Sequence, residues 1–594
     1  MKELRVYFEC LEQAAHFIKP LVEKTEAFKS GNINLQLIKL IGSHRVYSKQ
    51  VAPVVYLKDP DILFTIIEDG NEIPLFQLEI STAVFTEDHE LQRFDGIVSS
   101  VENNCIYGKL SPLNKKSQSK HGGNTNFDFR ISYAAIMQKY GKLSLHFDWP
   151  CDEKGNVLVN SEYLSCPERV NSLEYFVDEL LKFSLQYNFS KENWLKYFDK
   201  QLMKLKSVRE WHDEISKVII PDITKQNTTR TEWKPDESRF HLKLNRFGHA
   251  MDPERGMLAF YGTISEVVVA KMLFDEKNKS WYKDTPKEDE ITEYIENTSL
   301  EVAYNYLNCF MLGSGLYSNS DFKNIVKKYS KNNSETIEID LTKFLNKHFD
   351  NLNKPLRTLF KFAKEFQIID TEGAIKVKLL WGKIKPKMDF SKNPPVTPLH
   401  ERKLFDEDDI TYISVHNVLK QNGYKIVGVS YPGAQGDRVV LAEKENGRKQ
   451  KRRYIDIISY LPESHSSLQE NKGKFSKKSL QSEINELSKY KSDTNYIKAI
   501  NTFFELFDNK APKLLKIGVG FWANAKFQVE HIQGLNIDDL DYFIYITNDQ
   551  KLWKVFNTGD KQLFTKTTGN VELPPIFEIG ATEEEIPNLF STKE

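Results

Sequence analysis

The stretch RRYIDIISYL-PESHS-SLQENKGK, Arg452 to Lys474, reads as two strands joined by a short turn. In an antiparallel hairpin, opposed residues have a constant index sum, and pairing Asp456 with Glu470 places the midpoint at residue 463, within the turn. Side chains alternate along a strand, so Glu470 and Lys472 project to one side. We therefore expect two carboxylates and one amine to converge.

Two adjacent carboxylates repel each other, and a divalent cation between them removes that repulsion. Magnesium suits the pair, since it takes oxygen ligands and usually binds one or two carboxylates together with water and phosphate oxygens. Lys472 would then orient a water molecule or stabilise a negatively charged transition state. The alternative is an exposed cross-strand salt-bridge ladder. Against it, Asp456 is a lone charge between Ile455 and Ile457 in a strand of buried type.

The flanking segments extend the pattern on both sides of the hairpin. A helix is expected over DDITYISVHNVLKQNG, with Asp408 and Asp409 at its positive end and Gly423 as its C-cap. Further elements are expected in the strands KIVGVSYPG and DRVVLAE, the helix KKSLQSEINELSKYK and the strand LLKIGVGFW.

From Asp406 to Trp522 this region resembles the PD-(D/E)XK nuclease superfamily, whose core has the order αβββαβ. The resemblance implies a restriction-endonuclease-like fold and metal-dependent hydrolysis of DNA. It makes Asp456, Glu470 and Lys472 the catalytic residues, with Asp456 and Glu470 as ligands of Mg²⁺. The sequence departs from the superfamily pattern in having isoleucine, not proline, before Asp456.

Several basic residues are candidates for contacts with DNA phosphates or bases. The cluster GRKQKRR precedes the hairpin, and RFGHAMDPERG carries two arginines among turn-forming residues. For both segments the alternative is structural: a solvated turn or a salt-bridged domain junction. Asp437, in a glycine-rich turn, is a further acidic candidate or a simple turn residue. The predicted DNA-binding residues are Arg448, Lys451, Arg452, Arg453, Arg246 and Arg255.

A weaker version of the same pattern lies near the N-terminus. DPDILFTII and PLFQLEIS flank the turn EDGNE, and Asp61 paired with Glu79 has its midpoint at Gly70. This region also resembles the PD-(D/E)XK core, but Ser81 occupies the lysine position and carries no charge. We expect either a second site with Lys109 as the amine, or an inactive copy used for DNA binding or dimer contacts.

Composition limits the class of protein. The 594 residues are 40% hydrophobic and have a formal net charge of −1, which predicts several ordered domains and excludes a polycation coating nucleic acid. The five cysteines form no CxxC pair, MKELRVYFEC has no signal-peptide core, and no apolar run reaches membrane-spanning length, so we expect a cytoplasmic protein. Phosphate-loop, HExxH and GxSxG motifs are absent from the sequence.

We expect a mixed α/β, multidomain fold with a helical middle region. The predicted units are a nuclease-like domain over 1–145, a helical region over 146–235, a middle α/β or DNA-recognition region over 236–382, a linker over 383–403 and a PD-(D/E)XK domain over 404–594.

The predicted function is a Mg²⁺-dependent, type II restriction-like endonuclease that cuts duplex DNA at a specific sequence, either as one chain or as a homodimer. Two alternatives stay open. One is a regulated nuclease effector in antiviral defence or repair, and the other is a DNA-binding protein without catalysis.

Overall fold

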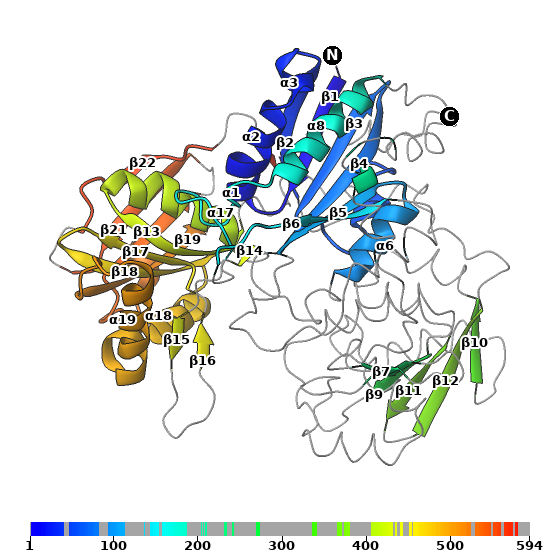
Figure 1. The fold of residues 1–594 in the computed structure, drawn as a ribbon. Coiled ribbons are helices and arrows are strands. Elements are labelled where there is room, and N and C mark those ends of the chain that lie inside the picture. Colours follow the sequence, from blue (N-terminus) through cyan, green and yellow to red (C-terminus); the bar gives the residue numbers. More distant parts are fainter. Residues whose placement is uncertain are drawn as a thin grey trace.

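The computed structural model describes two large α/β units and several shorter segments of the chain (Figure 1). The described residues are 2–40, 47–81, 93–112, 133, 136, 143–153, 157–186, 204, 206, 208–210, 231–233, 240–242, 269–273, 336–340, 365–370, 373–380, 406–431, 434–435, 440–442, 451–453, 455–473, 475–523, 529–547, 551–559, 563–573 and 577–579. The mixed α/β, multidomain character expected from the sequence is confirmed.

The N-terminal unit is built on a seven-stranded sheet with the order β23-β2-β1-β3-β4-β5-β6. The outermost strand next to β2 is β23, which comes from near the C-terminus and runs parallel to β2. The strands are β1 (Lys2–Phe8), β2 (Ile33–Lys39), β3 (Ile62–Glu68), β4 (Asn71–Ile80), β5 (Ile106–Ser111), β6 (Ser144–Asp148) and β23 (Phe577–Ile579).

Helices cover this sheet. A continuous helical segment follows β1 and contains one π-helical stretch, η1. Helix α8 lies in the region where the sequence predicts helices, and it packs against α2, α3 and β6. The helical elements are α1 (Leu11–Gln13), η1 (Ala14–Ile18), α2 (Lys19–Glu23), α3 (Glu26–Lys29), α4 (Ala52–Val55), α6 (Phe94–Glu102) and α8 (Asn171–Gln186).

The C-terminal unit is an eight-stranded sheet with the order β14-β13-β17-β18-β19-β20-β21-β22. Its strands are β13 (Lys425–Tyr431), β14 (Ala434–Gln435), β17 (Ile457–Leu461), β18 (His465–Lys472), β19 (Leu515–Ala523), β20 (Tyr542–Thr547), β21 (Leu552–Asn557) and β22 (Thr568–Asn570). Its helices are α17 (Glu407–Ile413), η6 (Ser414–Leu419), η7 (Lys420–Asn422), α18 (Lys477–Ser492), α19 (Thr494–Phe507) and η8 (Val529–Ile532).

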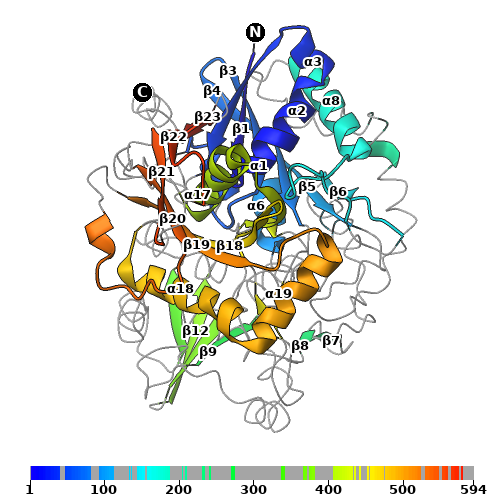
Figure 2. The same cartoon turned by 90° about the vertical axis from the view of Figure 1, so that its left-hand side faces the viewer.

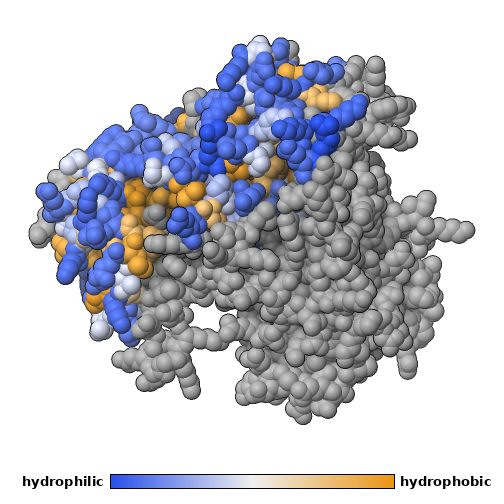
Figure 3. All heavy atoms as spheres, viewed as in Figure 1, coloured by the Kyte–Doolittle hydropathy of each residue, from blue (hydrophilic) through white to orange (hydrophobic). Residues whose placement is uncertain are grey.

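Helices pack on both faces of this C-terminal sheet. Alternate residues of its strands therefore belong to two different hydrophobic cores, one on each face. Ile457 packs in the core shared with α17 and η6, whereas Ile458 packs in the core under α18 and α19. Figure 2 shows α18 and α19 lying across one face of the sheet. The face drawn in Figure 3 is largely hydrophilic over the described residues, as expected when apolar side chains are withdrawn into such cores.

One expected strand is divided. RRYIDIISYL forms β16 (Lys451–Arg453) and then β17, which belong to different sheets. DRVVLAE contributes β15 (Val440–Ala442), which pairs with β16 in a separate two-stranded ribbon and not in the main sheet. The middle of the chain supplies a β7–β8 pair (Thr231–Trp233, Phe240–Leu242) and the sheet β10-β12-β11-β9, made of β9 (Val269–Leu273), β10 (Thr336–Asp340), β11 (Glu365–Asp370) and β12 (Gly373–Leu380).

The two large sheets share an inner arrangement of five strands. The orders β1-β3-β4-β5-β6 and β13-β17-β18-β19-β20 have the same sequence of antiparallel, antiparallel, parallel and parallel pairings. The connections differ, since the long helix and β2 lie between β1 and β3, whereas α17 precedes β13. The register predicted for the C-terminal hairpin is observed, with Ile457 paired with Gln469. In the N-terminal hairpin Ile62 pairs with Leu78, as predicted, but a bulge between Phe64 and Thr65 shifts the pairing nearer the turn by one residue.

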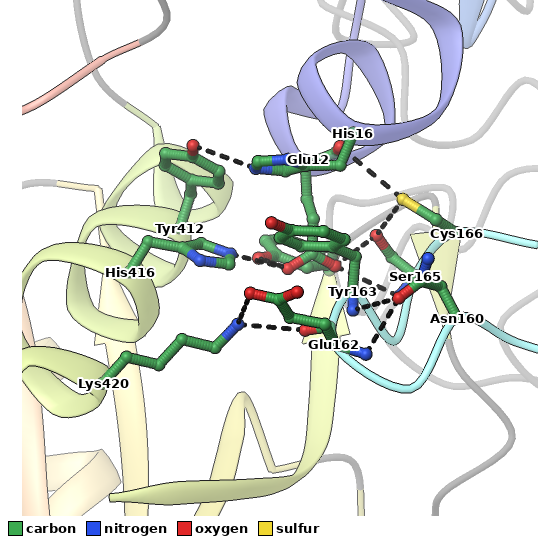
Figure 4. Close-up of polar contacts among 11 residues, drawn as sticks. Glu12, His16, Asn160, Glu162, Tyr163, Ser165, Cys166, Tyr412, His416 and Lys420 are labelled. Carbon is green, nitrogen blue, oxygen red and sulfur yellow. Dashed lines mark hydrogen bonds and ion pairs between the residues drawn. The ribbon is translucent and has the colours of Figure 1, made fainter. Parts of the chain in front are cut away.

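The two units are joined by buried polar contacts (Figure 4). Glu12 of α1 is 1% exposed, and its Oε1 accepts hydrogen bonds from His416 Nε2 at 2.9 Å and Tyr431 Oη at 3.2 Å. Its Oε2 accepts from the Ser165 backbone N–H at 3.1 Å and from the Ser165 hydroxyl at 2.5 Å. A buried carboxylate is costly unless its oxygens are hydrogen-bonded. The four hydrogen bonds that Glu12 accepts therefore hold three segments of the chain together: α1, the loop at Ser165 and the C-terminal unit.

Lys39 forms a second buried link between the units. Its Nζ, at the end of β2, lies 3.0 Å from Asp409 Oδ1 and 3.2 Å from Asp406 Oδ2 at the start of α17. Ion pairs that are withdrawn from water require close partners. This pair therefore places the first turn of α17 against the N-terminal unit.

We expect Gly518→Ala to destabilise the protein. A Cβ at Gly518 would overlap the ring of Tyr542, whose hydroxyl is held by Ser467 at 2.7 Å and Gln469 at 3.2 Å. Overpacking of this kind costs about 1–3 kcal/mol. Thermal unfolding monitored by circular dichroism checks it, with Gly559→Ala as the control because no atom lies within 4 Å of a Cβ there. Equal melting temperatures for the two variants would contradict the packing described.

Candidate active site

Asp456 is held immediately before β17 by its own backbone and by the neighbouring strand. Its carbonyl oxygen accepts a hydrogen bond from Ser430 N–H at 2.9 Å, and its Oδ2 accepts one from Asn471 N–H at 2.5 Å. The side chain is 7% exposed. The carboxylate is thus fixed at the start of an interior strand, beside β18.

Strand β18 carries the other two predicted residues. Glu470 is 5% exposed, and Lys472 ends the strand with a partly buried side chain. The ladder ends at the pair of Ile457 with Gln469, so Asp456 and Glu470 are the next residues beyond it on the two strands. Both Asp456 and Glu470 act electrostatically on the Lys472 ammonium. The structure therefore brings the three predicted residues to one end of the hairpin.

Two further glutamates complete the site, and neither was predicted. Glu407 Oε2, in the first turn of α17, lies 3.3 Å from Lys472 Nζ, and Glu483 Oε1 of α18 lies 3.6 Å from it. Asp408 and Asp409, in the predicted acidic helix start, follow Glu407 in the same helical turn, and Asp409 pairs with Lys39. Acidic residues in a first turn are a weak signal, because they occur in many helices for the sake of the helix dipole.

Asn471 positions α17 over the strand. Its side-chain Nδ2 donates to Thr411 Oγ1 at 3.0 Å, and its Oδ1 accepts from Gln469 Nε2 at 2.8 Å. Thr411 in turn donates to the Glu407 carbonyl at 2.9 Å. One residue between Glu470 and Lys472 therefore holds both Asp456 and the helix turn that bears Glu407.

The site has an excess of negative charge. Burial, together with the nearby Glu407 and Glu483, raises the pKa of Asp456 to about 7 against the lowering effects of the Asn471 N–H and Lys472. Burial lowers the pKa of Lys472, but Glu407, Glu483, Asp456 and Glu470 outweigh burial and raise it. Lys472 is therefore an ammonium ion near neutral pH, and four carboxyl groups face a single cation.

This chemistry fits a hard divalent cation, with Asp456 and Glu470 as the protein ligands. Within the described ranges, no three His, Cys, Asp or Glu side chains converge as a ready-made metal shell. Magnesium does not need such a shell, since it usually keeps several waters and takes the remaining ligands from substrate phosphate.

The N-terminal candidates occupy the corresponding place in their sheet. Asp61 and Glu79 are 5% and 1% exposed, and Asp61 Oδ2 accepts a hydrogen bond from Ile80 N–H at 2.5 Å. Ser81 is buried at the end of this strand. Lys109, the predicted amine, is buried on β5 in register with Glu79.

Lys58 and Arg93 make the direct ion pairs with Glu79, and the sequence did not single them out. Lys58 Nζ lies 2.9 Å from Glu79 Oε1, and Arg93 Nε lies 2.5 Å from the same oxygen. Burial would raise the pKa of Glu79, but Lys58, Arg93 and Lys109 lower it to about 2. Burial, Glu79 and Glu9 raise the pKa of Asp61 well above its ordinary value.

The other predicted residues receive little structural description. Lys451, Arg452 and Arg453 form the backbone of β16. Arg448, Asp437, the RFGHAMDPERG segment with Arg246 and Arg255, and the predicted linker at 383–403 lie outside the described residues. Their proposed contacts with DNA stay predictions.

No family model, no curated protein and no solved structure matches this chain. Among the helices that the structure describes, none is both long and apolar enough to cross a membrane. Assignment of a function therefore depends on the geometry of the site itself.

We expect Asp456→Asn to stabilise the metal-depleted protein at about pH 8 more than at about pH 5. The raised pKa means that the folded chain keeps a proton that the unfolded chain releases above about pH 4, so this group's contribution to stability is lost as pH rises through about 7. An amide imitates the protonated form. At about 1.4 kcal/mol per pKa unit, the gain is a few kcal/mol.

Thermal unfolding in the presence of EDTA measures this effect. Asp538→Asn, at an exposed position in the same unit, is the matched control. A pH-independent effect of Asp456→Asn would show that Asp456 ionises normally in the folded chain.

Proposed function

We propose that this chain is a metal-dependent DNA endonuclease of the PD-(D/E)XK type, with its catalytic site at Asp456, Glu470 and Lys472. The observation that carries the proposal is the buried Asp456 carboxylate, held by Asn471 N–H and placed beside Glu470 and the Lys472 ammonium. Apart from the short elements η6, η7 and β14 to β16, and the helix α19, the element order is α17, β13, β17, β18, α18, β19, which supports the proposal because that superfamily has the order αβββαβ.

Asp456 and Glu470 would hold Mg²⁺, which supplies positive charge at the scissile phosphate. Asp456 must lose its proton to serve as a ligand, and its pKa of about 7 makes this a step near neutral pH. Lys472, as an ammonium ion, stabilises the charge that develops on the phosphate oxygens. Because it is already protonated at rest, it is poorly suited to take a proton from water.

Glu407 and Glu483 position Lys472. Their carboxylates lie 3.3 Å and 3.6 Å from its Nζ, on helices from opposite faces of the sheet. They keep the ammonium at the end of β18, where the substrate phosphate would enter. Duplex DNA is the proposed substrate because the sequence carries the basic cluster GRKQKRR shortly before this hairpin.

We expect Lys472→Ala to lower cleavage of a supercoiled plasmid about 10²–10³-fold, because one transition-state donor is lost. Cleavage should require Mg²⁺ and stop with EDTA. Sequencing the ends tests specificity, since a restriction-like enzyme leaves fixed ends whereas a regulated effector leaves scattered ones. Lys510→Ala, at an exposed position in the same unit, is the control. Binding without cleavage by the unaltered chain would instead favour a DNA-binding protein.

We also expect the cleavage rate at subsaturating Mg²⁺ to fall as pH drops below about 7, because Asp456 then retains its proton. Glu407→Gln should move this midpoint to lower pH, since the Glu407 charge raises the pKa of Asp456. A rate–pH profile for both proteins measures the shift. An unchanged midpoint in Glu407→Gln would mean that another group controls the profile.

A further inference from the structure

The N-terminal cluster reproduces the main-chain geometry of the C-terminal site. Glu9 N–H donates to the Asp61 carbonyl at 2.9 Å, as Ser430 N–H donates to the Asp456 carbonyl at 2.9 Å. Ile80 N–H donates to Asp61 Oδ2 as Asn471 N–H donates to Asp456 Oδ2, both at 2.5 Å. Asp61 directly precedes β3, and Asp456 directly precedes β17, which is the first strand of its hairpin in each unit. Glu79 and Glu470 each lie one residue before the residue whose N–H donates.

The neighbouring strand is equivalent as well. Gly108 precedes the residue paired with Glu79, and Gly518 precedes the residue paired with Glu470. In each case an aromatic ring occupies the space of the missing side chain, although Phe76 belongs to β4 and Tyr542 to β20, on opposite sides of the glycine-bearing strand. These matches are independent of the acidic side chains, so they identify the same place in two sheets of the same order.

The two sites differ in the origin of their positive charge. Ser81 stands where the C-terminal site has Lys472. Lys58, three residues before Asp61, approaches both oxygens of Glu79, at 2.9 Å and 3.2 Å. Arg93, the N-cap residue of α6, binds the same carboxylate. The amine missing from β4 is thus supplied by the segment that precedes Asp61.

We propose that Asp61, Glu79 and Lys58 form a second phosphodiester-cleaving site, in which Lys58 takes the role of the lysine absent at Ser81. The inference rests on the proposed function of the C-terminal site. Asp61 and Glu79 would hold a divalent cation such as Mg²⁺, and Lys58 and Arg93 are then the charges left to contact the phosphate oxygens.

The reaction at this site is hydrolysis. The oxygen of one water molecule forms a bond to phosphorus, and the bond from phosphorus to the 3′ oxygen of the sugar breaks. The attacking water loses a proton to solvent, and the leaving 3′ oxygen gains one from solvent. The products are a 5′-phosphate and a 3′-hydroxyl, and no oxidant or further reactant is consumed.

The contact between the two units suggests that each site cuts one strand of the duplex. Glu12 bonds to His416 at 2.9 Å, and His16 bonds to Tyr412 at 3.2 Å, so the earlier residue of α1–η1 contacts the later residue of α17–η6 and the reverse (Figure 4). This is the crossed pairing found in a two-fold symmetric interface. Strands of duplex DNA are antiparallel. We therefore assign one strand of the duplex to each site.

The test is strand-specific cleavage of a supercoiled plasmid by the full-length chain with Mg²⁺. The unaltered chain should produce linear DNA. Asp456→Asn and Asp61→Asn should each produce open circles, with nicks in opposite strands by primer extension, and the double variant should produce neither. If Asp61→Asn linearises DNA as fast as the unaltered chain, or abolishes cutting of both strands, a second independent site is overturned. An unaltered chain that never cuts refutes the proposed function instead.

Lys58 is tested by rescue, which a purely structural role would not give. Lys58→Ala should slow nicking of the strand assigned to the N-terminal site at least tenfold, and Lys58→Ala combined with Ser81→Lys should restore it. Lys19→Ala, which removes a surface pair with Glu23 on α2, is the matched control. Unchanged nicking in a folded Lys58→Ala protein overturns the assignment of Lys58.

Discussion

A buried carboxylate at the start of a central strand is the constraint around which each unit is organised. Asp456 and Asp61 cannot turn to solvent, because the carbonyl and the carboxylate of each are bound to N–H groups of neighbouring strands. Burial penalises the charged form, so cations must approach or a proton must stay bound. The lysines and arginine near the two sites follow from this electrostatic demand.

The two units compensate the charge of their buried carboxylates differently. At Asp456, one ammonium faces four carboxyl groups, and the pKa of the aspartate rises to about 7. At Asp61, Lys58 and Arg93 saturate Glu79 and lower its pKa to about 2, while Asp61 itself favours its proton. The C-terminal cluster therefore keeps more uncompensated negative charge, whereas in the N-terminal cluster two basic side chains are paired with Glu79.

The junction between the units depends on polar burial as much as on apolar packing. One core contains residues of both units, from Leu11 on α1 to Ile410 on α17. Within it, Glu12 has four hydrogen-bond donors from the second unit and from the loop at Ser165, and Lys39 pairs with the start of α17. Lys39 binds Asp409 while Glu407, two residues away, faces Lys472. The same helical turn thus serves both the junction and the proposed site.

Local pattern was sufficient for the hairpins and for the pairing next to the carboxylates. Strand alternation and turn position determine which residues oppose one another, so the pairs Ile457–Gln469 and Ile62–Leu78 followed from counting residues. The bulge between Phe64 and Thr65 was not predicted. The mixed α/β class and the helices flanking the C-terminal hairpin followed from periodicity. The sequence pattern predicted one continuous strand over RRYIDIISYL, but this segment is divided between two sheets.

Tertiary structure decided which charges meet. Glu407 and Glu483 reach Lys472 from helices on opposite faces of one sheet, and Arg93 reaches Glu79 from the start of a helix. Lys58 is near Asp61 in sequence, but its pairing with Glu79 depends on the fold of the hairpin. Such contacts join residues of unrelated sequence separation, and no periodicity encodes them. The sequence by itself determined the strand-borne carboxylates, because neighbours on a hairpin obey a fixed register; the packing of helices on the sheets determined the charges around them.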